Sequence, residues 1–227
     1  MEIITISSVS EFQELVHKRR LHYTKPLYRG EPFLDEDKPL KPKIGRLKPK
    51  GRYTHHEREV ESLKEFIRRA SPYLETVPKN LWDQLAIAQH HGLSTRLLDW
   101  TENPLVAAFF ASNKNRKSDS VIYFLDSASH SHYGRFVDHL PTPFDIFDNM
   151  VFRPNHITPR IAAQAGIFTV HPNPLLQFNP DDLQKWVLKS EILRVLYKTL
   201  DSYGINEATV FPGLDGIAKY LERTEGV

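Results

Sequence analysis

The sequence of 227 residues contains no cysteine. This absence excludes disulfide bridges, thiolate metal sites, iron–sulfur clusters and cysteine nucleophiles, so any metal would need histidine and carboxylate ligands. The sequence also lacks an apolar run approaching about eighteen residues, and its first residues lack a basic segment followed by an apolar core. We therefore expect a cytoplasmic protein without a membrane span.

A strong excess of one charge is absent as well. The 30 lysines and arginines are nearly balanced by 28 aspartates and glutamates, which leaves a formal net charge of +2. That balance is far from the basic excess typical of proteins that bind a nucleic-acid backbone. With 40% hydrophobic residues, the chain is long enough for one substantial core, and we predict a single domain over residues 1–227.

Several common catalytic motifs are missing too. The sequence contains no Gly-x-Gly-x-x-Gly, no Walker-type phosphate loop, no Gly-x-Ser-x-Gly elbow and no His-Glu-x-x-His. Two pairs of adjacent histidines, His55-His56 and His90-His91, are present. Neighbouring side chains on a helix or strand point in different directions, so we predict no metal site.

The elements that the sequence does indicate interleave irregularly. Apolar spacing predicts helices over 57–70 and 80–90, while Val121–Leu125 reads as a central buried strand. Residues 31–54 and 126–157 are rich in polar residues and proline, and we expect both to run over the surface. This pattern favours an α+β fold, in which helices flank a mixed central β-sheet.

Polar side chains that are costly to bury gather in three segments. In the first, Tyr28-Arg29-Gly30, an arginine ends an apolar strand, where its guanidinium can bind a phosphate or carboxylate or form a structural ion pair. Another of these segments, residues 160–168, contains Arg160 and Gln164 among small apolar residues. The Gln164 amide can orient a ribose or be a satisfied core amide, but it cannot act as a general base.

The second segment, residues 88–100, holds the most polar groups, among them His90, Ser94, Thr95, Arg96 and Asp99. These groups suit a ligand site. Equally, Arg96 and Asp99 can pair with each other, and His90 can cap the end of a helix. Seven lysines and arginines between Lys38 and Arg52 form either a solvated loop or a contact with nucleic acid.

In these segments the sequence resembles the FRG domain family, named for the aromatic-Arg-Gly motif that stands here as Tyr28-Arg29-Gly30. The resemblance is strongest over residues 89–104, which read QHHGLSTRLLDWTENP, and it returns at residues 160–168 and 211–216. It covers nearly the whole chain. The order of these segments is similar to that of ADP-ribosyltransferase-like folds.

That similarity implies roles for several residues. An early basic residue would anchor NAD, here Arg29, and a strand with hydroxyl groups would scaffold the nicotinamide pocket, here Ser94 and Thr95. Gln164 stands where such folds have a glutamate that stabilises an oxocarbenium-like transition state. A neutral amide lacks the negative charge that favours a developing cation, which argues against ordinary transferase chemistry.

We therefore expect an intracellular enzyme-like domain that binds NAD or a related nucleotide and transfers or cleaves its ADP-ribose, in a bacterial toxin or phage-defence setting. His90 and Gln164 are the catalytic candidates, and the ligand-binding candidates are Tyr28, Arg29, Ser94, Thr95, Arg96, Asp99 and Arg160. Two alternatives stay open. One is a non-catalytic module that binds a nucleotide or a protein, and the other is an RNA-binding or RNA-processing domain that uses His90 and the basic loop.

Overall fold

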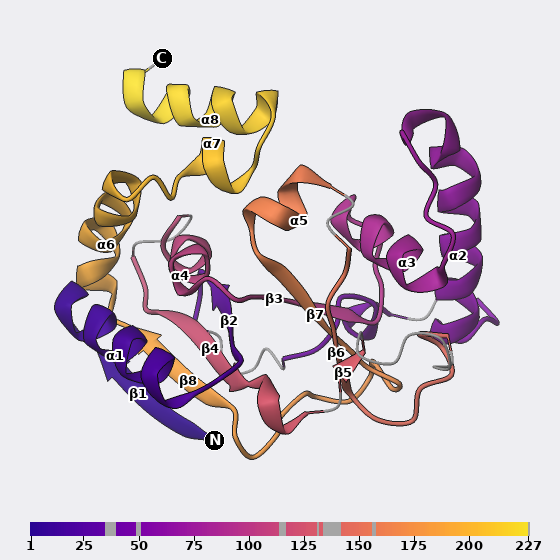
Figure 1. Cartoon of the computed structure of the whole chain (residues 1–227), viewed down its shortest axis with the longest axis horizontal. Coiled ribbons are helices and arrows are strands. Elements are labelled where there is room, and N and C mark those ends of the chain that lie inside the picture. The colour runs from indigo at the N-terminus through magenta and orange to yellow at the C-terminus, as the bar shows by residue number, and fades with distance from the viewer. Residues whose placement is uncertain are drawn as a thin grey trace.

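A computed structural model of the chain describes residues 1–34, 40–48, 51–113, 117–130, 132–133, 142–155 and 158–226. Within these residues, eight strands form one sheet in the order β1-β8-β4-β2-β3-β7-β6-β5 (Figure 1). The strands are β1 (Glu2–Ile6), β2 (Pro26–Glu31), β3 (Leu97–Thr101), β4 (Ser120–Asp126), β5 (His132–Tyr133), β6 (Met150–Phe152), β7 (Gly166–Val170) and β8 (Gln184–Leu188). The pairs β1–β8 and β5–β6 are parallel and the other neighbours are antiparallel. The prediction of an α+β fold with a mixed central sheet is confirmed.

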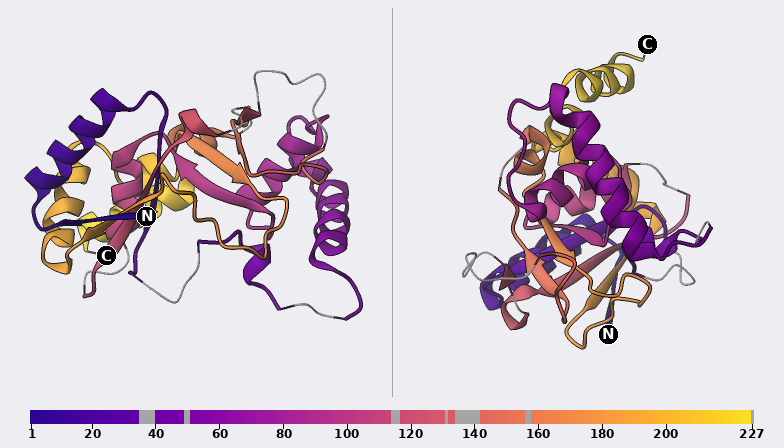
Figure 2. Two further views of the ribbon diagram at one scale, coloured as in Figure 1. Left: turned by 90° about the horizontal axis from the view of Figure 1, so that it is seen from below. Right: turned by 90° about the vertical axis from the view of Figure 1, so that its right-hand side faces the viewer.

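The helices surround this sheet (Figure 2). They are α1 (Val9–His22), α2 (His55–Ala70), α3 (Leu81–His90), α4 (Pro104–Ser112), α5 (Pro159–Ala163), α6 (Ser190–Ser202), α7 (Glu207–Val210) and α8 (Leu214–Glu225), with short 3-10 turns η1 (Ile44–Arg46), η2 (Ser71–Tyr73) and η3 (Ser127–Ser129). Within the described ranges, no helix is both long and apolar enough to cross a membrane.

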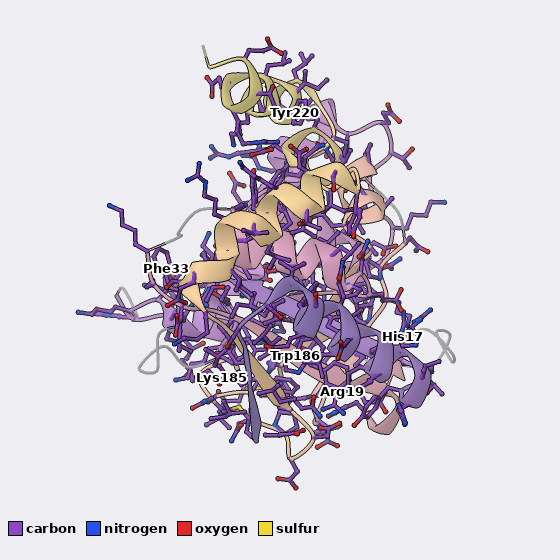
Figure 3. All side chains as sticks on the ribbon, turned by 90° about the vertical axis from the view of Figure 1, so that its left-hand side faces the viewer. His17, Arg19, Phe33, Lys185, Trp186 and Tyr220 are labelled. Atoms are coloured by element: carbon purple, nitrogen blue, oxygen red, sulfur yellow. The ribbon has the colours of Figure 1, made fainter. Side chains whose placement is uncertain are left out.

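One face of the sheet packs against α1, α4 and α6. Trp186 of β8 stacks on Phe124 of β4 with ring centroids 5.4 Å apart, and Tyr28 of β2 meets both rings edge-on. Figure 3 views the molecule from the side of α1 and α6 and labels Trp186, which belongs to this core. α4 is apolar all round because it lies between the sheet and α6, where Phe109 is completely buried.

The rest of the sheet is covered by different segments. α2 and α3 pack on β3, β6 and β7 through Leu63, Leu85 and Phe168. On the opposite face, Leu40 and Phe178 come from irregular segments and cover the buried side chains of β2, β3 and β4. Because irregular chain covers this face, its backbone groups rely on contacts such as the hydrogen bond from Phe178 N to Leu40 O (2.8 Å).

Two predicted surface segments prove more deeply involved in the core. The segment 126–157 contains β6, which pairs with β7 and buries Val151 and Phe152, so the prediction of a wholly surface course is wrong there. The segment 31–54 contains η1 and buries Leu40 and Ile44. The sequence did not indicate the buried parts of these two segments, because their apolar residues are sparse and show no periodicity. Parts of these segments, residues 35–39, 49–50, 134–141 and 156–157, lie outside the described residues.

Candidate functional site

Backbone pairing in the sheet is interrupted between β2 and β3. These strands pair at one register position, Tyr28 opposite Thr101, whereas β2 and β4 pair along six positions. After Tyr28, a side chain connects the two strands: Nη1 of Arg29 donates a hydrogen bond to the carbonyl oxygen of Asp99 on β3 at 2.7 Å. A side chain thus satisfies a strand carbonyl that has no backbone donor on this edge.

Gly30 follows because α4 crosses β2 at this point. A Cβ atom at residue 30 would lie 1.9 Å from the carbonyl oxygen of Ala107. Only glycine allows the backbone of β2 to approach the helix so closely. The aromatic-Arg-Gly motif therefore has three structural roles here: Tyr28 fills the core, Arg29 bridges to β3, and Gly30 admits α4.

A cleft of about 720 Å³ opens at this discontinuity. Its walls come from β2, β3, α3 and α5, which are labelled in Figure 1, and from η1. Six of the nine predicted site residues line it, namely Tyr28, Arg29, His90, Asp99, Arg160 and Gln164. Segments far apart in the sequence thus bring their polar side chains to one place.

Arg29 and Glu31 form a tight pair at the cleft wall. The Nε and Nη2 atoms of Arg29 donate to Glu31 Oε1 at 3.1 and 2.6 Å, and Nη1 also lies 3.5 Å from Asp99 Oδ2. Burial alone would lower the pKa of Arg29, but the two carboxylates outweigh it and raise that pKa. Arg29 therefore remains charged and is already well supplied with acceptors.

Asp99 is held from the other side by Gln89 of α3. Gln89 Nε2 donates to Asp99 Oδ1 at 3.1 Å, and the hydroxyl of Thr95 donates to Gln89 Oε1 at 2.6 Å. Thr95 Oγ1 itself accepts from the backbone N–H of Leu97, so the hydroxyl proton must point to Gln89. Thr95 thereby fixes which end of the Gln89 amide faces Asp99, whose side chain is 60% exposed toward the cleft.

His90 is the last residue of α3 and projects into the cleft half-buried. Burial lowers the pKa of its imidazole to about 4, the charges of Arg160 and His91 add to this effect, and Asp99 opposes it. The ring is therefore neutral at pH 7 and offers one nitrogen as a hydrogen-bond or proton acceptor.

Gln164 reaches the cleft from the end of α5. Its backbone carbonyl accepts from the Thr101 hydroxyl at 2.6 Å, and its side-chain Nε2 donates to the carbonyl oxygen of Val210 at 3.1 Å. The next residue, Ala165, has a φ of 44°, which makes the sharp turn into β7. Because the side-chain nitrogen of Gln164 already donates to Val210, its amide oxygen is the group that can accept a hydrogen bond from a ligand.

Ser94, Thr95 and Arg96 are outside the cleft lining. The Arg96 side chain is 1% exposed and forms a buried ion pair with Glu59 of α2, with Nε 2.9 Å from Oε2. It is further engaged by the carbonyl of Pro143 and by the ring of Phe144, which lies 4.7 Å from the guanidinium carbon. Arg96 pairs with Glu59 and not with Asp99, and it ties α2 to the strand region.

Tyr28 borders the cleft, but its ring belongs to the core. The side chain is 1% exposed, and burial raises the pKa of its hydroxyl to about 12. Trp100 is likewise buried, and its Nε1 donates to Thr169 Oγ1 at 3.0 Å. Neither ring presents a free face for stacking on a base.

Sequence reasoning missed six polar residues among those described in the cleft lining, Glu31, Lys43, Arg46, Gln89, His91 and Thr101. Arg46 and Lys43 lie in the basic segment 38–52, which was treated as a solvated loop or a nucleic-acid contact. The buried residue between them, Ile44, is the signal that this segment folds back onto the core. Residues 38, 39, 49 and 50 of the same segment lie outside the described ranges.

A second cavity of about 1260 Å³ adjoins the cleft and runs along α7 and α8. The two cavities share His90, His91, Phe110 and Arg160. Throughout the described part of the chain, no group of three or more histidine or carboxylate side chains is arranged to hold a metal ion.

Part of the cleft lies in a segment that matches the model of a known protein family. Residues 24–120 match the model of the FRG domain, whereas no curated protein and no solved structure matches the chain. The matched segment includes the discontinuity between β2 and β3 with Arg29, His90 and Asp99, and ends before Arg160 and Gln164. The chain is therefore similar to the FRG domain over residues 24–120.

Proposed function

We propose that this chain binds NAD or a related nucleotide in the cleft between β2 and β3. One observation carries the proposal: Arg29, His90, Asp99, Arg160 and Gln164 converge on a single cavity of about 720 Å³. Ligand pockets commonly have volumes of about 300–1,000 Å³, so the cleft has room for a nucleotide.

The chemistry of the lining supports such a ligand. Lysine and arginine side chains there suit phosphate groups, because a guanidinium matches the oxygens of a phosphate. The carboxylate of Asp99 and the amide oxygen of Gln164 suit ribose hydroxyls, which are hydrogen-bond donors. Neutral His90 adds an acceptor without a competing positive charge.

A specific pair of groups favours cleavage of the bound nucleotide as a second function. Gln164 has no negative charge with which to stabilise a cation, whereas the exposed carboxylate group of Asp99 suits an oxocarbenium-like centre. As the bond between ribose and nicotinamide breaks, water attacks the ribose carbon and neutral His90 accepts the proton of that water. Transfer of ADP-ribose to a protein or nucleic-acid target would suit a toxin or phage-defence role.

The test combines thermal unfolding with product analysis. NAD and ADP-ribose should raise the unfolding temperature of the chain saturably, and mass spectrometry should detect nicotinamide released from NAD. Asp99→Asn and His90→Gln should reduce release, whereas the exposed control Glu65→Gln on α2 should not. Saturable binding without nicotinamide would overturn the cleavage step alone, and the absence of any stabilisation would overturn nucleotide binding.

A further inference from the structure

The three arginines of the cleft differ in how they are satisfied. Each of the three nitrogens of Arg29 already donates to Glu31 or to the Asp99 carbonyl, and the side chain is only 14% exposed. To reach a ligand, Arg29 would have to move away from the carboxylate of Glu31, which is only 13% exposed. Arg29 is therefore poorly suited to bind a phosphate directly.

Arg46 and Arg160 line the same cleft without an ion pair or hydrogen bond from their guanidinium groups to any described residue. Arg160 stacks on Phe211, with its guanidinium carbon 4.7 Å from the ring centroid. Burial lowers the pKa of both arginines, and for Arg46 the charge of Arg29 adds to that effect. Asp99 opposes the shift of both arginines and Glu31 opposes that of Arg46, but each pKa stays below its ordinary value. Their positive charges are thus incompletely compensated, and an anion between them would compensate both.

Both arginines also stand on well-anchored segments. Arg46 ends η1, in which Ile44 is buried and its N–H donates to the carbonyl of Thr95 at 3.4 Å. A Cβ atom at Gly45 would lie 1.7 Å from the carbonyl of Pro174, so η1 packs tightly against that segment. The position of Arg46 is therefore set by the core and does not depend on a free loop.

The charges of the cleft match a doubly charged anion. Among the described residues, its lining holds four cations, Arg29, Lys43, Arg46 and Arg160, and the two carboxylates of Glu31 and Asp99, while His90 is neutral. The excess of two positive charges equals the charge of a diphosphate linkage. Arg160 also borders the second cavity, so an anion held there would lie where the two cavities meet.

We propose that Arg46 and Arg160 together bind the diphosphate of the nucleotide, while Arg29 positions Asp99 and Glu31 and makes no contact with the ligand. This inference rests on the proposed nucleotide site and specifies which part of the ligand is recognised. Two guanidinium groups on separate elements, η1 and α5, can each bind one phosphate in a bidentate manner. A single phosphate would engage only one of them fully.

Calorimetric titration of the full chain with adenosine, AMP and ADP-ribose tests this assignment. We expect affinity to increase in that order, and inorganic pyrophosphate to compete with ADP-ribose. Arg46→Gln and Arg160→Gln should each weaken ADP-ribose binding by about tenfold or more, because each removes a charge-assisted contact, and should leave adenosine binding nearly unchanged. Lys48→Gln, an equal charge change on an exposed residue outside the cleft lining, is the matched control.

The outcomes separate the two proposals. ADP-ribose binding that stays at wild-type strength in both Arg46→Gln and Arg160→Gln would overturn the assignment of the diphosphate and leave the nucleotide site intact. No binding of any nucleotide by the wild-type chain would overturn the proposed function itself. The variant Arg29→Lys should lose stability more than affinity, and a loss of affinity at an unchanged unfolding temperature would contradict the role given to Arg29.

Discussion

The buried pair Arg96–Glu59 offers a sharp test of why an arginine stands in the middle of the FRG segment. Arg96 is 1% exposed and Glu59 is completely buried, and the carboxylate accepts from both the side chain and the backbone N–H of Arg96. Burial raises the pKa of Glu59, and the guanidinium of Arg96 opposes that shift. Substitution Glu59→Ala would leave the guanidinium buried without its counter-charge.

The expected cost follows from this geometry. Removing one partner of a buried ion pair destabilises a protein by about 3–5 kcal/mol. For a chain of 227 residues, each kcal/mol lowers the unfolding temperature by about 2–4 °C, so Glu59→Ala should lower it by about 6–20 °C. Glu65→Gln on the same helix removes only exposed pairs with Arg68 and Arg69 and should change the unfolding temperature little.

Calorimetric or fluorescence-monitored thermal unfolding measures this difference. The double variant Glu59→Leu with Arg96→Met should be less destabilised than either single change, because no unpaired charge remains. Nucleotide affinity of the folded protein should survive in these variants. If Arg96→Met removed nucleotide binding while the unfolding temperature stayed at the wild-type value, Arg96 would be a ligand residue and the structural reasoning would be refuted.

Three further predictions concern the walls of the cleft. Gly30→Ala should lower the free energy of unfolding by at least about 3 kcal/mol, because the new Cβ would lie 1.9 Å from a carbonyl oxygen of α4. Gly92 has a φ of 91° and open space around it, so Gly92→Ala should lower that free energy by only about 1 kcal/mol. Urea unfolding measures both changes. Thr95→Val should cost about 1–3 kcal/mol and weaken ADP-ribose binding, since it frees the Gln89 amide to rotate; unchanged affinity would contradict the positioning role. Burial lowers the pKa of His90 from 6.5 to about 4. The unfolded chain therefore takes up the proton at a higher pH than the folded chain, and the free energy of unfolding falls as the pH drops from about 6.5 to about 4. Urea unfolding at pH 7 and pH 5 should show a smaller fall in this free energy for His90→Gln than for the wild-type chain.

Local sequence patterns predicted the elements that form the site. Periodicity depends on residues that are close in sequence, and α3 ends at His90 as expected from the helix predicted over 80–90. The convergence of Arg29 and Gln164 was suggested by the family resemblance. Spacing alone could not supply it, because the order of strands in a sheet is a long-range property.

The partners of individual charges were beyond the sequence for the same reason. Arg96 and Asp99 are close in sequence, yet Arg96 pairs with Glu59 from a helix 37 positions earlier. Arg96 lies just before β3 and Asp99 lies three positions later within that strand, and the two side chains bind different partners, Glu59 and Gln89. The role of Arg46 was missed because two isolated apolar residues, Leu40 and Ile44, anchor its segment and give no helical or strand periodicity.

A crystal structure of the chain soaked with ADP-ribose would test the central claim most directly. The account predicts the nucleotide in the cleft between β2 and β3, with its phosphates against Arg46 and Arg160 and its ribose near Asp99 and Gln164, while Arg29 keeps its contacts with Glu31. A nucleotide bound elsewhere on the molecule, or a cleft in which Arg29 leaves Glu31 to hold the phosphates, would contradict it.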